Sequence, residues 1–279
     1  MDGFILINKE IGETSNNVVQ KVKKVLKAKK VGHLGTLDPI AEGLLILAIN
    51  KATKFSSYFL ESDKSYDVEV EFGTSTDTDD STGKIIYESN DYPNKTLVKN
   101  HLESFIGESM QIPPFFSALK YKGKPLYKYA RRGEFISKPP RKISVTCIEN
   151  LDLNNKVCSF RIYCSKGTYI RSIARDLGKK LGCGAHVKSL IRLSQGNFNI
   201  SDAKNTSDIL EEHIISIENA FKNLNKITIE PLDEKKFING VTISKFNNKD
   251  DIYRVFSKNN TFIGIGEINK NNLKHKQLV

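Results

Sequence analysis

The 279-residue sequence has no hydrophobic run long enough to cross a bilayer, because its longest apolar stretch, residues 43–49, has only seven residues. The first ten residues, MDGFILINKE, lack a basic segment followed by a long apolar one, so we expect no signal peptide. The sequence therefore predicts a cytoplasmic protein that does not contact a membrane.

The sequence also lacks the usual metal and cofactor motifs. Its four cysteines form no C-x-x-C pair, which argues against a zinc ribbon and a thiol redox motif. Residues 77–88 have acidic side chains spaced as in a calcium loop, but Thr82 occupies the position that requires glycine. Residues 31–38 contain two glycines but not the Lys-Ser/Thr of a phosphate-binding loop. We expect neither a metal nor a cofactor.

Positive charge is what the sequence has in excess. It contains 43 Lys and Arg against 32 Asp and Glu, for a formal net charge of +11. Such a balance favours a polyanionic partner, most often nucleic acid, although a solvated basic surface explains it equally well. Apolar residues make up 39% of the chain, which is enough for a hydrophobic core.

Strand and helix patterns occur together without regular alternation. Apolar residues alternate along residues 65–72, and residues 143–153 and 156–164 have the pattern of a hairpin. Helical patterns cover residues 15–29, 168–181 and 207–213. These elements predict an α+β fold with a mixed, mostly antiparallel central sheet flanked by helices. After about residue 222 only short strand-like pieces follow, so we expect a large domain at 1–222 and a small β-rich domain at 223–279.

Most of the positive excess lies in residues 118–142, which hold nine basic residues and a single acid, Glu134. Four aromatic residues are interleaved with these charges: Tyr121, Tyr127, Tyr129 and Phe135. Basic side chains bind phosphates and aromatic faces stack on unpaired bases, so this segment favours contact with RNA. The alternative is a solvated basic loop in which Tyr127 and Ala130 pack inward from a short helix.

The loop at residues 31–38 reads VGHLGTLD and is followed by Pro39. An Asp-Pro pair is a common helix start, with Asp as the N-cap and Pro in the first turn. Spacing alone therefore favours a capping role for Asp38 and an ordinary loop role for His33.

A second segment, residues 164–193, reads CSKGTYIRSIARDLGKKLGCGAHVKSLIRL. Together with the loop it closely resembles the tRNA pseudouridine synthase B family, bacterial enzymes that isomerise uridine-55 in the tRNA T-loop. The resemblance continues in Lys64-Ser65-Tyr66, in FGTSTDTDDSTG at 72–83 and in QIPPFFSALKYKGKPLYKYARRG at 111–133. It covers roughly residues 1–200 and implies the pseudouridine synthase fold, with a PUA-like RNA-binding domain at the C-terminus.

The resemblance implies three catalytic residues. In that family the aspartate of G-H-x-G-x-L-D-P is the catalytic carboxylate, which implies this role for Asp38. Arg171 of G-T-Y-I-R matches the arginine that pairs with the aspartate, and Tyr66 matches the tyrosine that stacks on the target base. A carboxylate can attack ribose C1′, attack uracil C6 or remove the C2′ proton, and the sequence leaves these three routes open. None of them needs a redox cofactor or a group donor.

The resemblance also implies residues that bind the substrate. Tyr169 and Leu190 match residues that line the uracil pocket, and His33 matches the histidine that fills the space left by an extruded base. Residues 118–142 match the mobile thumb that closes on the RNA. The basic residues expected to contact RNA are Lys64, Lys120, Lys122, Lys124, Arg131 and Arg132.

Two positions depart from the family pattern. Phe116 stands where the family often has tyrosine, which removes a hydroxyl near the substrate channel. Ile191 replaces the first arginine of L-R-R-L and leaves Arg192 alone, which weakens one expected basic contact. We still expect an active enzyme: a monomer that acts on the T-arm of tRNA without a protein partner. The alternatives are a catalytically idle RNA-binding protein and a relative of the guide-RNA-dependent archaeal and eukaryotic enzymes.

Overall fold

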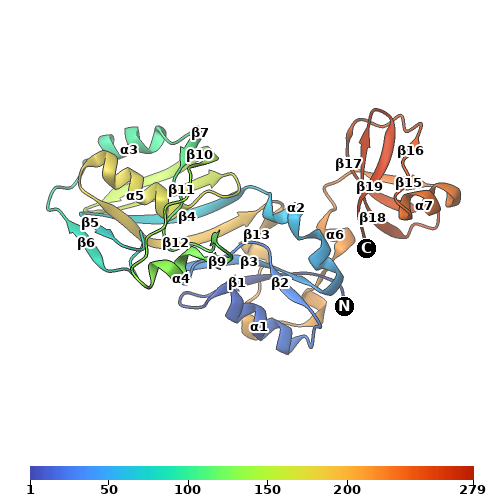
Figure 1. The fold of residues 1–279 in the computed structure, drawn as a ribbon, viewed down its shortest axis with the longest axis horizontal. Helices are drawn as coiled ribbons and strands as arrows, with labels where there is room; N and C mark the ends of the chain where they lie inside the picture. The colour runs from blue at the N-terminus through green and yellow to red at the C-terminus, as the bar shows by residue number, and fades with distance from the viewer.

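The computed structural model describes residues 1–279 and has two parts of unequal size (Figure 1). The larger part is built on a mixed sheet of ten strands, and the smaller, C-terminal part on a separate sheet of five. Most neighbouring strands of the large sheet are antiparallel, as predicted. The α+β class is therefore confirmed.

The path of the large sheet runs in the order β14-β1-β3-β12-β4-β11-β10-β7, with β2 added to β3 and β13 to β12. Its strands are β1 (Gly3–Lys9), β2 (Val31–His33), β3 (Ala41–Ile49), β4 (Lys64–Phe72), β7 (Gly107–Gln111), β10 (Arg141–Asn154), β11 (Val157–Cys164), β12 (Ala185–Gln195), β13 (Phe198–Asn199) and β14 (Ile215–Ser216). The predicted hairpin is confirmed as β10 and β11, and the predicted alternating strand is β4.

Strand β12 joins the two halves of this sheet. It pairs parallel with β3 on one side and antiparallel with β4 on the other, so that Leu190 lies between Ala41 and Val68. Gly43 of β3 has a φ of +94°, and a Cβ atom added there would collide with the carbonyl of Arg192. The close approach of β3 to β12 therefore requires glycine at this position.

The helices differ from the sequence prediction mainly at their ends. They are α1 (Ser15–Val25), α2 (Ser56–Leu60), α3 (Lys95–Glu103), α4 (Leu126–Ala130), α5 (Ile170–Leu181), α6 (Ile217–Ala220) and α7 (Pro231–Ile238). Helix α1 ends four residues earlier than expected. The helix expected at 207–213 is wrong: two short 3-10 turns at Thr206–Asp208 and Glu211–His213 replace it. Between them Ile209 is buried in the core, and seven residues are too few to propagate a helix unaided.

The expected helix start at Asp38 is also wrong. No helix follows Pro39; the chain makes a turn in which the Ala41 amide donates to the Asp38 carbonyl, and β3 then begins at Ala41. The apolar run of β3 is buried almost throughout as the strand between β1 and β12, and this tertiary pairing overrides the local capping signal. The Asp38 carboxylate is therefore free to do something other than cap a helix.

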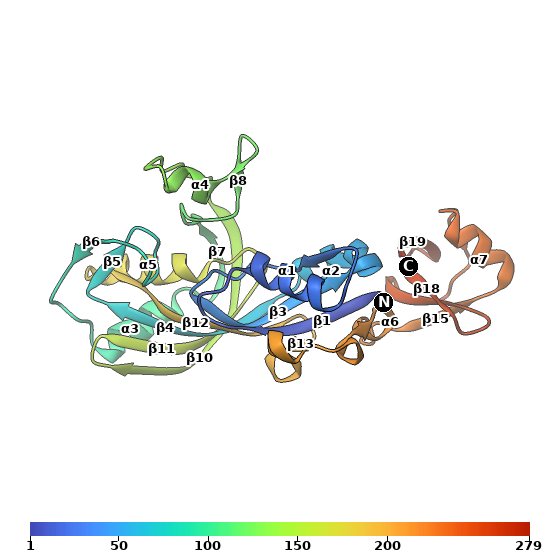
Figure 2. The same ribbon diagram turned by 90° about the horizontal axis from the view of Figure 1, so that it is seen from below.

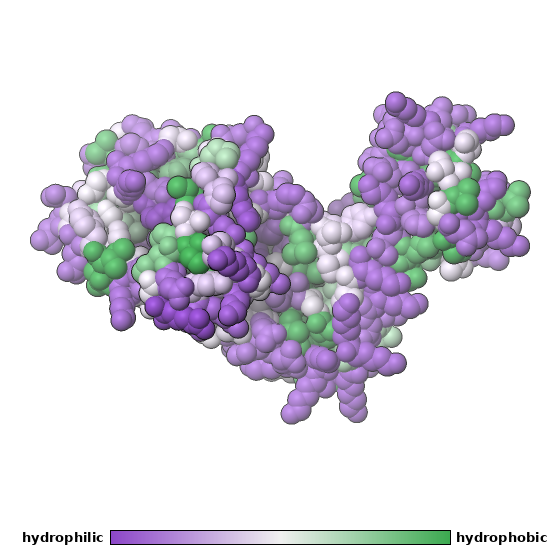
Figure 3. All heavy atoms as spheres, in the orientation of Figure 1, coloured by the Kyte–Doolittle hydropathy of each residue, from purple (hydrophilic) through white to green (hydrophobic).

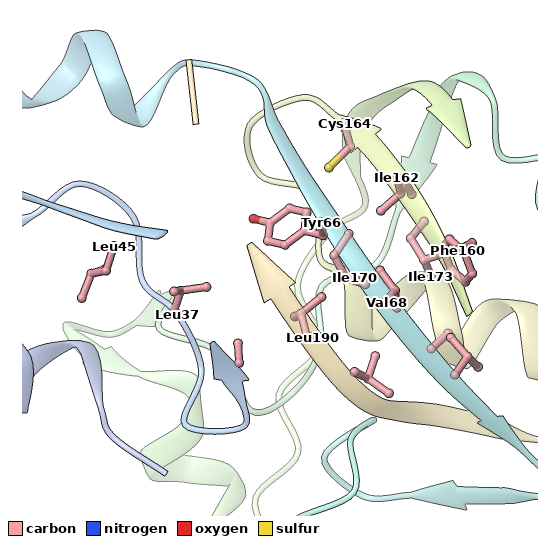
Figure 4. Close-up of a cluster of buried hydrophobic side chains, with 14 of the residues drawn as sticks. Leu37, Leu45, Tyr66, Val68, Phe160, Ile162, Cys164, Ile170, Ile173 and Leu190 are labelled. Atoms are coloured by element: carbon pink, nitrogen blue, oxygen red, sulfur yellow. The ribbon is translucent and has the colours of Figure 1, made fainter. Parts of the chain in front are cut away.

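Two hydrophobic clusters stabilise the large part. One contains Tyr66, Leu190 and Ile170 and extends between the sheet and helices α1 and α5; Figure 4 shows these side chains close together. The other is aromatic: Phe221 lies 5.2 Å from Phe59 and 5.7 Å from Phe55 between ring centroids. Ile265 of the C-terminal part belongs to this second cluster, so apolar packing joins the two parts.

Residues 118–142 leave the sheet as a projection that stands away from its face (Figure 2). Two short strands, β8 (Lys120–Tyr121) and β9 (Lys124–Pro125), pair with each other and lead into α4. We call residues 118–142 the thumb. Figure 3 shows that the most hydrophilic spheres on that face of the molecule gather where α4 lies.

The C-terminal part is small and rich in β-structure, as expected. Its sheet has the order β15-β17-β18-β19-β16, formed by β15 (Lys226–Ile229), β16 (Ile243–Ser244), β17 (Asp251–Ser257), β18 (Phe262–Asn269) and β19 (Asn272–Leu278). Helix α7 was not predicted, and it supplies Phe237 to the core of this part. A further hairpin in the large part pairs β5 (Thr74–Thr76) with β6 (Ile85–Glu88). Across the structure, no helix combines the length and the apolar character needed to span a membrane.

Candidate active site

A cavity of about 330 Å³ opens where the loop before β3, the strands β4 and β12, the start of α5 and the root of the thumb meet. Six of the predicted site residues line it: Asp38, Lys64, Tyr66, Tyr169, Arg171 and Leu190. These residues come from distant parts of the chain, and they meet because β12 pairs with both β3 and β4. A second hollow of about 420 Å³ shares only Lys64 with this cavity and contains none of the other predicted residues.

The centre of the cavity is an ion pair between Arg171 and Asp38. Nη2 of Arg171 lies 2.8 Å from Oδ2 of Asp38. The arginine side chain is 3% exposed, whereas that of Asp38 is 34% exposed, so the carboxylate faces the cavity and the guanidinium lies behind it. Such a charged hydrogen bond orients the carboxylate toward the cavity.

Further acceptors hold the Arg171 guanidinium in place. Nη1 donates to the Thr78 carbonyl at 2.8 Å and lies 3.6 Å from the carboxylate of Asp80, which is itself buried. Nη2 also donates to the backbone carbonyl of Phe116 at 2.8 Å. Asp80 was missed by the sequence analysis because only the fold brings the 72–83 segment against α5. The Phe116 contact uses the backbone, so it does not depend on the tyrosine hydroxyl that this chain lacks.

Tyr66 forms part of the cavity wall and is 7% exposed. Its ring lies near Leu190 and Ile170, and its hydroxyl points away from Ile162 and Phe160 (Figure 4). Burial raises the pKa of Tyr66 to about 12, so the phenol is protonated at neutral pH. The residue therefore offers an aromatic face together with a neutral hydroxyl, and it is also a member of the core.

Three buried side chains hold the loop that carries Asp38. Ser15 Oγ accepts from the Leu37 amide at 2.8 Å and donates to its carbonyl at 2.9 Å, while the neighbouring Thr14 caps α1. Gln195 donates to the Leu34 carbonyl, and Arg192 donates to the Gly35 carbonyl at 3.2 Å. The loop is thus fixed from β12 and α1 before any substrate binds.

Arg192 and Lys64 add positive charge to the cavity wall. Arg192 is 1% exposed, so it is an interior residue that reaches the cavity from β12. Burial, with a smaller contribution from Arg192, lowers the pKa of Lys64 to about 8. Sequence reasoning missed the interior position of Arg192 because a basic residue next to a hydrophobic run is usually exposed.

His33 and the basic thumb residues do not line the cavity. His33 lies at the end of β2, with Nδ1 buried and without a hydrogen-bond partner. Burial, together with the charge of Arg192, lowers the pKa of His33, so its ring is neutral at pH 7. Tyr129 stacks edge-on against Tyr121, with 5.8 Å between centroids, and the Arg131 guanidinium lies 5.4 Å from the Tyr127 ring.

Comparison with known proteins shows the family of this chain. Residues 23–170 match the model of the TruB family pseudouridylate synthase N-terminal domain. A protein of Clostridium acetobutylicum named tRNA pseudouridine synthase B is 41% identical over 98% of both chains. The chain belongs to the TruB family. Residues 171–235 match the tRNA pseudouridylate synthase B C-terminal domain, and residues 226–279 match a second TruB C-terminal model.

Other TruB relatives show similar agreement. The tRNA pseudouridine synthase B of Clostridium kluyveri is 42% identical over 95% of both chains. That of Blochmanniella floridana is 47% identical over 83% of this chain and 88% of its own. The resemblance inferred from the sequence motifs is therefore confirmed.

Solved structures support the fold. The structure titled "Crystal Structure of a Cbf5-Nop10-Gar1 Complex" matches 99% of this chain and 84% of its own, with a TM-score of 0.74 and 23% identity. A chain in an H/ACA RNP bound to a substrate RNA containing 2′-deoxyuridine matches 99% of this TruB-family chain and 84% of its own, with a TM-score of 0.72 and 22% identity. The predicted pseudouridine synthase fold is confirmed.

Proposed function

We propose that this protein is a tRNA pseudouridine synthase that isomerises uridine-55 of the T-loop, with Asp38 as its catalytic carboxylate. The observation that carries this proposal is the Arg171–Asp38 ion pair, which presents a partly exposed carboxylate inside a cavity below a basic thumb. The names of the TruB relatives support tRNA as the substrate.

The reaction breaks the bond between ribose C1′ and uracil N1 and forms a bond between C1′ and C5. The C5 proton leaves and N1 gains a proton, so no atom, electron pair or cofactor is added. Asp38 would act as nucleophile or base in one of the three routes open to a carboxylate. Arg171 would keep that carboxylate oriented throughout.

Asp38 lies in a cavity that protein side chains line, so a base that is stacked within the T-loop would have to leave its stack to reach the carboxylate. Extrusion of a base costs a few kcal/mol, which RNA-binding contacts elsewhere must offset. The thumb charges at Lys120, Lys122, Lys124, Arg131 and Arg132 would supply contacts to phosphates. In the cavity, Tyr66, Tyr169 and Leu190 would enclose the uracil, and His33 would stack in the vacated space. Lys64 would approach the substrate from the cavity wall.

We further propose that residues 1–222 form the catalytic domain and residues 223–279 a PUA-like RNA-binding domain. The separate five-stranded sheet within 226–278 supports this division. The enzyme would work as a monomer in the cytoplasm, without a protein partner.

The decisive experiment uses the purified protein and an unmodified tRNA transcript. Pseudouridine would be mapped by carbodiimide labelling and primer extension, with a transcript carrying cytidine at position 55 as the control. We expect one new modified position, uridine-55. No modification, or modification only when a guide RNA is added, would contradict the proposal and favour the idle or the guide-dependent alternative.

A further inference from the structure

Arg192 is a fully buried cation without a carboxylate partner. Its side chain is 1% exposed and forms no ion pair, whereas Arg171, at similar depth, has Asp38 and Asp80 as partners. Desolvation of a guanidinium is costly, so its hydrogen-bond acceptors must offset the lost hydration. The groups that surround the Arg192 guanidinium therefore indicate what it does.

Two backbone carbonyls fix the orientation of the Arg192 guanidinium. Nε donates to the Leu44 carbonyl at 2.7 Å and Nη2 donates to the Gly35 carbonyl at 3.2 Å. Because the guanidinium is planar and rigid, these two bonds also set the direction of its remaining N–H groups.

The residue directly opposite Arg192 in the sheet is Tyr66. The two are paired in the antiparallel register of β12 with β4, so their side chains lie on the same face, and both line the cavity. Burial has the largest effect on the pKa of Tyr66 and raises it, whereas the positive charge of Arg192 acts in the opposite direction.

A guanidinium can only donate hydrogen bonds, so the Tyr66 oxygen must be the acceptor in any bond with Arg192. The phenolic O–H then has to point elsewhere, and the open direction is the cavity. We propose that Arg192 is a positioning residue that fixes the Tyr66 hydroxyl so that its proton points at the target base. This inference rests on the proposed function, since it assumes that a uracil occupies the cavity.

The test is a double-mutant cycle on the single-turnover rate of pseudouridine formation in tRNA. Arg192→Gln should lower this rate about 10- to 100-fold, while the Kd for tRNA changes less than about twofold. In a Tyr66→Phe background the same substitution should change the rate less than about threefold, because the hydroxyl that Arg192 orients is absent. Arg192→Lys, which keeps one charged donor, should recover part of the loss.

Gln195→Met provides the matched control, because Gln195 holds the same loop from the same strand and its amide donates to the Leu34 and Phe59 carbonyls, not to Tyr66. Its effect should be equal in both backgrounds. If the effects of Arg192→Gln and Tyr66→Phe multiply, the inference is wrong. Should Arg192→Gln fail to fold by circular dichroism, Arg192→Lys completes the cycle. Absence of pseudouridine with the unaltered protein would contradict the proposed function instead, so the two failures are distinguishable.

Discussion

Arg171 and Asp38, 133 positions apart in the sequence, meet at 2.8 Å between guanidinium and carboxylate. The arginine comes from the first turn of α5, and the aspartate from a loop whose backbone is held by Ser15, Arg192 and Gln195. Because other groups fix both partners, the ion pair is preorganised before substrate binds.

Asp38→Asn should abolish pseudouridine formation and leave tRNA binding largely unchanged. The amide keeps the size of the side chain but can act neither as nucleophile nor as base. Release of tritium from tRNA labelled at uridine C5 measures the reaction, and filter binding measures the affinity. Asp152→Asn, on the surface, is the control and should keep normal activity. Appreciable turnover by Asp38→Asn would contradict the catalytic role.

Replacement of the thumb lysines Lys120, Lys122, Lys124 and Lys128 by alanine should weaken tRNA binding and reduce its dependence on salt. Each lost phosphate contact lowers the slope of log K against log salt by about 0.7 to 0.9. A control variant removes the same charge at Lys84, Lys95, Lys99 and Lys156, of which the last three form ion pairs with acidic residues. An identical slope in the two variants would mean that the thumb charges do not contact RNA.

His33→Ala should slow extrusion of the target base more than initial docking of the tRNA. The ring is neutral at pH 7 because burial lowers its pKa, so its contribution is a flat surface and not a charge. Stopped-flow fluorescence of a 2-aminopurine beside position 55 separates the two steps. His33→Phe, which keeps a flat ring, should restore much of the rate. Equal slowing of both steps by His33→Ala would argue against stacking in the vacated space.

The free energy of unfolding should rise between pH 8 and 10.5, and Lys9→Met should remove part of that rise. Burial lowers the pKa of Lys9 from 10.5 to about 8, so in this range the unfolded chain binds more protons than the folded one. The free energy of unfolding therefore rises with pH, by about 3 kcal/mol for a shift of this size. Lys64 contributes a similar rise, which remains in the variant. Urea unfolding across this range, with exposed Lys51→Met as the control, measures the difference; an unchanged slope would contradict it.

Phe221→Ala should cost about 3–5 kcal/mol of unfolding free energy, because it leaves a cavity among Phe4, Phe55, Tyr58 and Phe59. Phe135→Ala, in the exposed thumb, should change stability by less than about 1 kcal/mol. Chemical denaturation measures the unfolding free energy of both variants. Similar losses in the two would mean that the aromatic cluster contributes little.

The parts of the fold that depend on local pattern were predictable. Alternation along β4 and the β10–β11 hairpin follow from neighbours close in the sequence, and the motifs around Asp38 and Arg171 identified the family. The Asp-Pro helix start was wrong because pairing of β3 with β1 and β12 is worth more than one cap. The interior positions of Arg192 and Asp80 could not be predicted, because burial of a charged side chain depends on elements that are distant in sequence.

Strand β12 completes both halves of the sheet, and this has a consequence for synthesis on the ribosome. A nascent chain that ends before residue 185 already contains Asp38, Tyr66 and Arg171 but has nothing to bridge β3 and β4. Its site cannot close, so the protein cannot act on RNA while it is still being translated through that point. The site is therefore complete only after β12 has been synthesised and has paired with both β3 and β4.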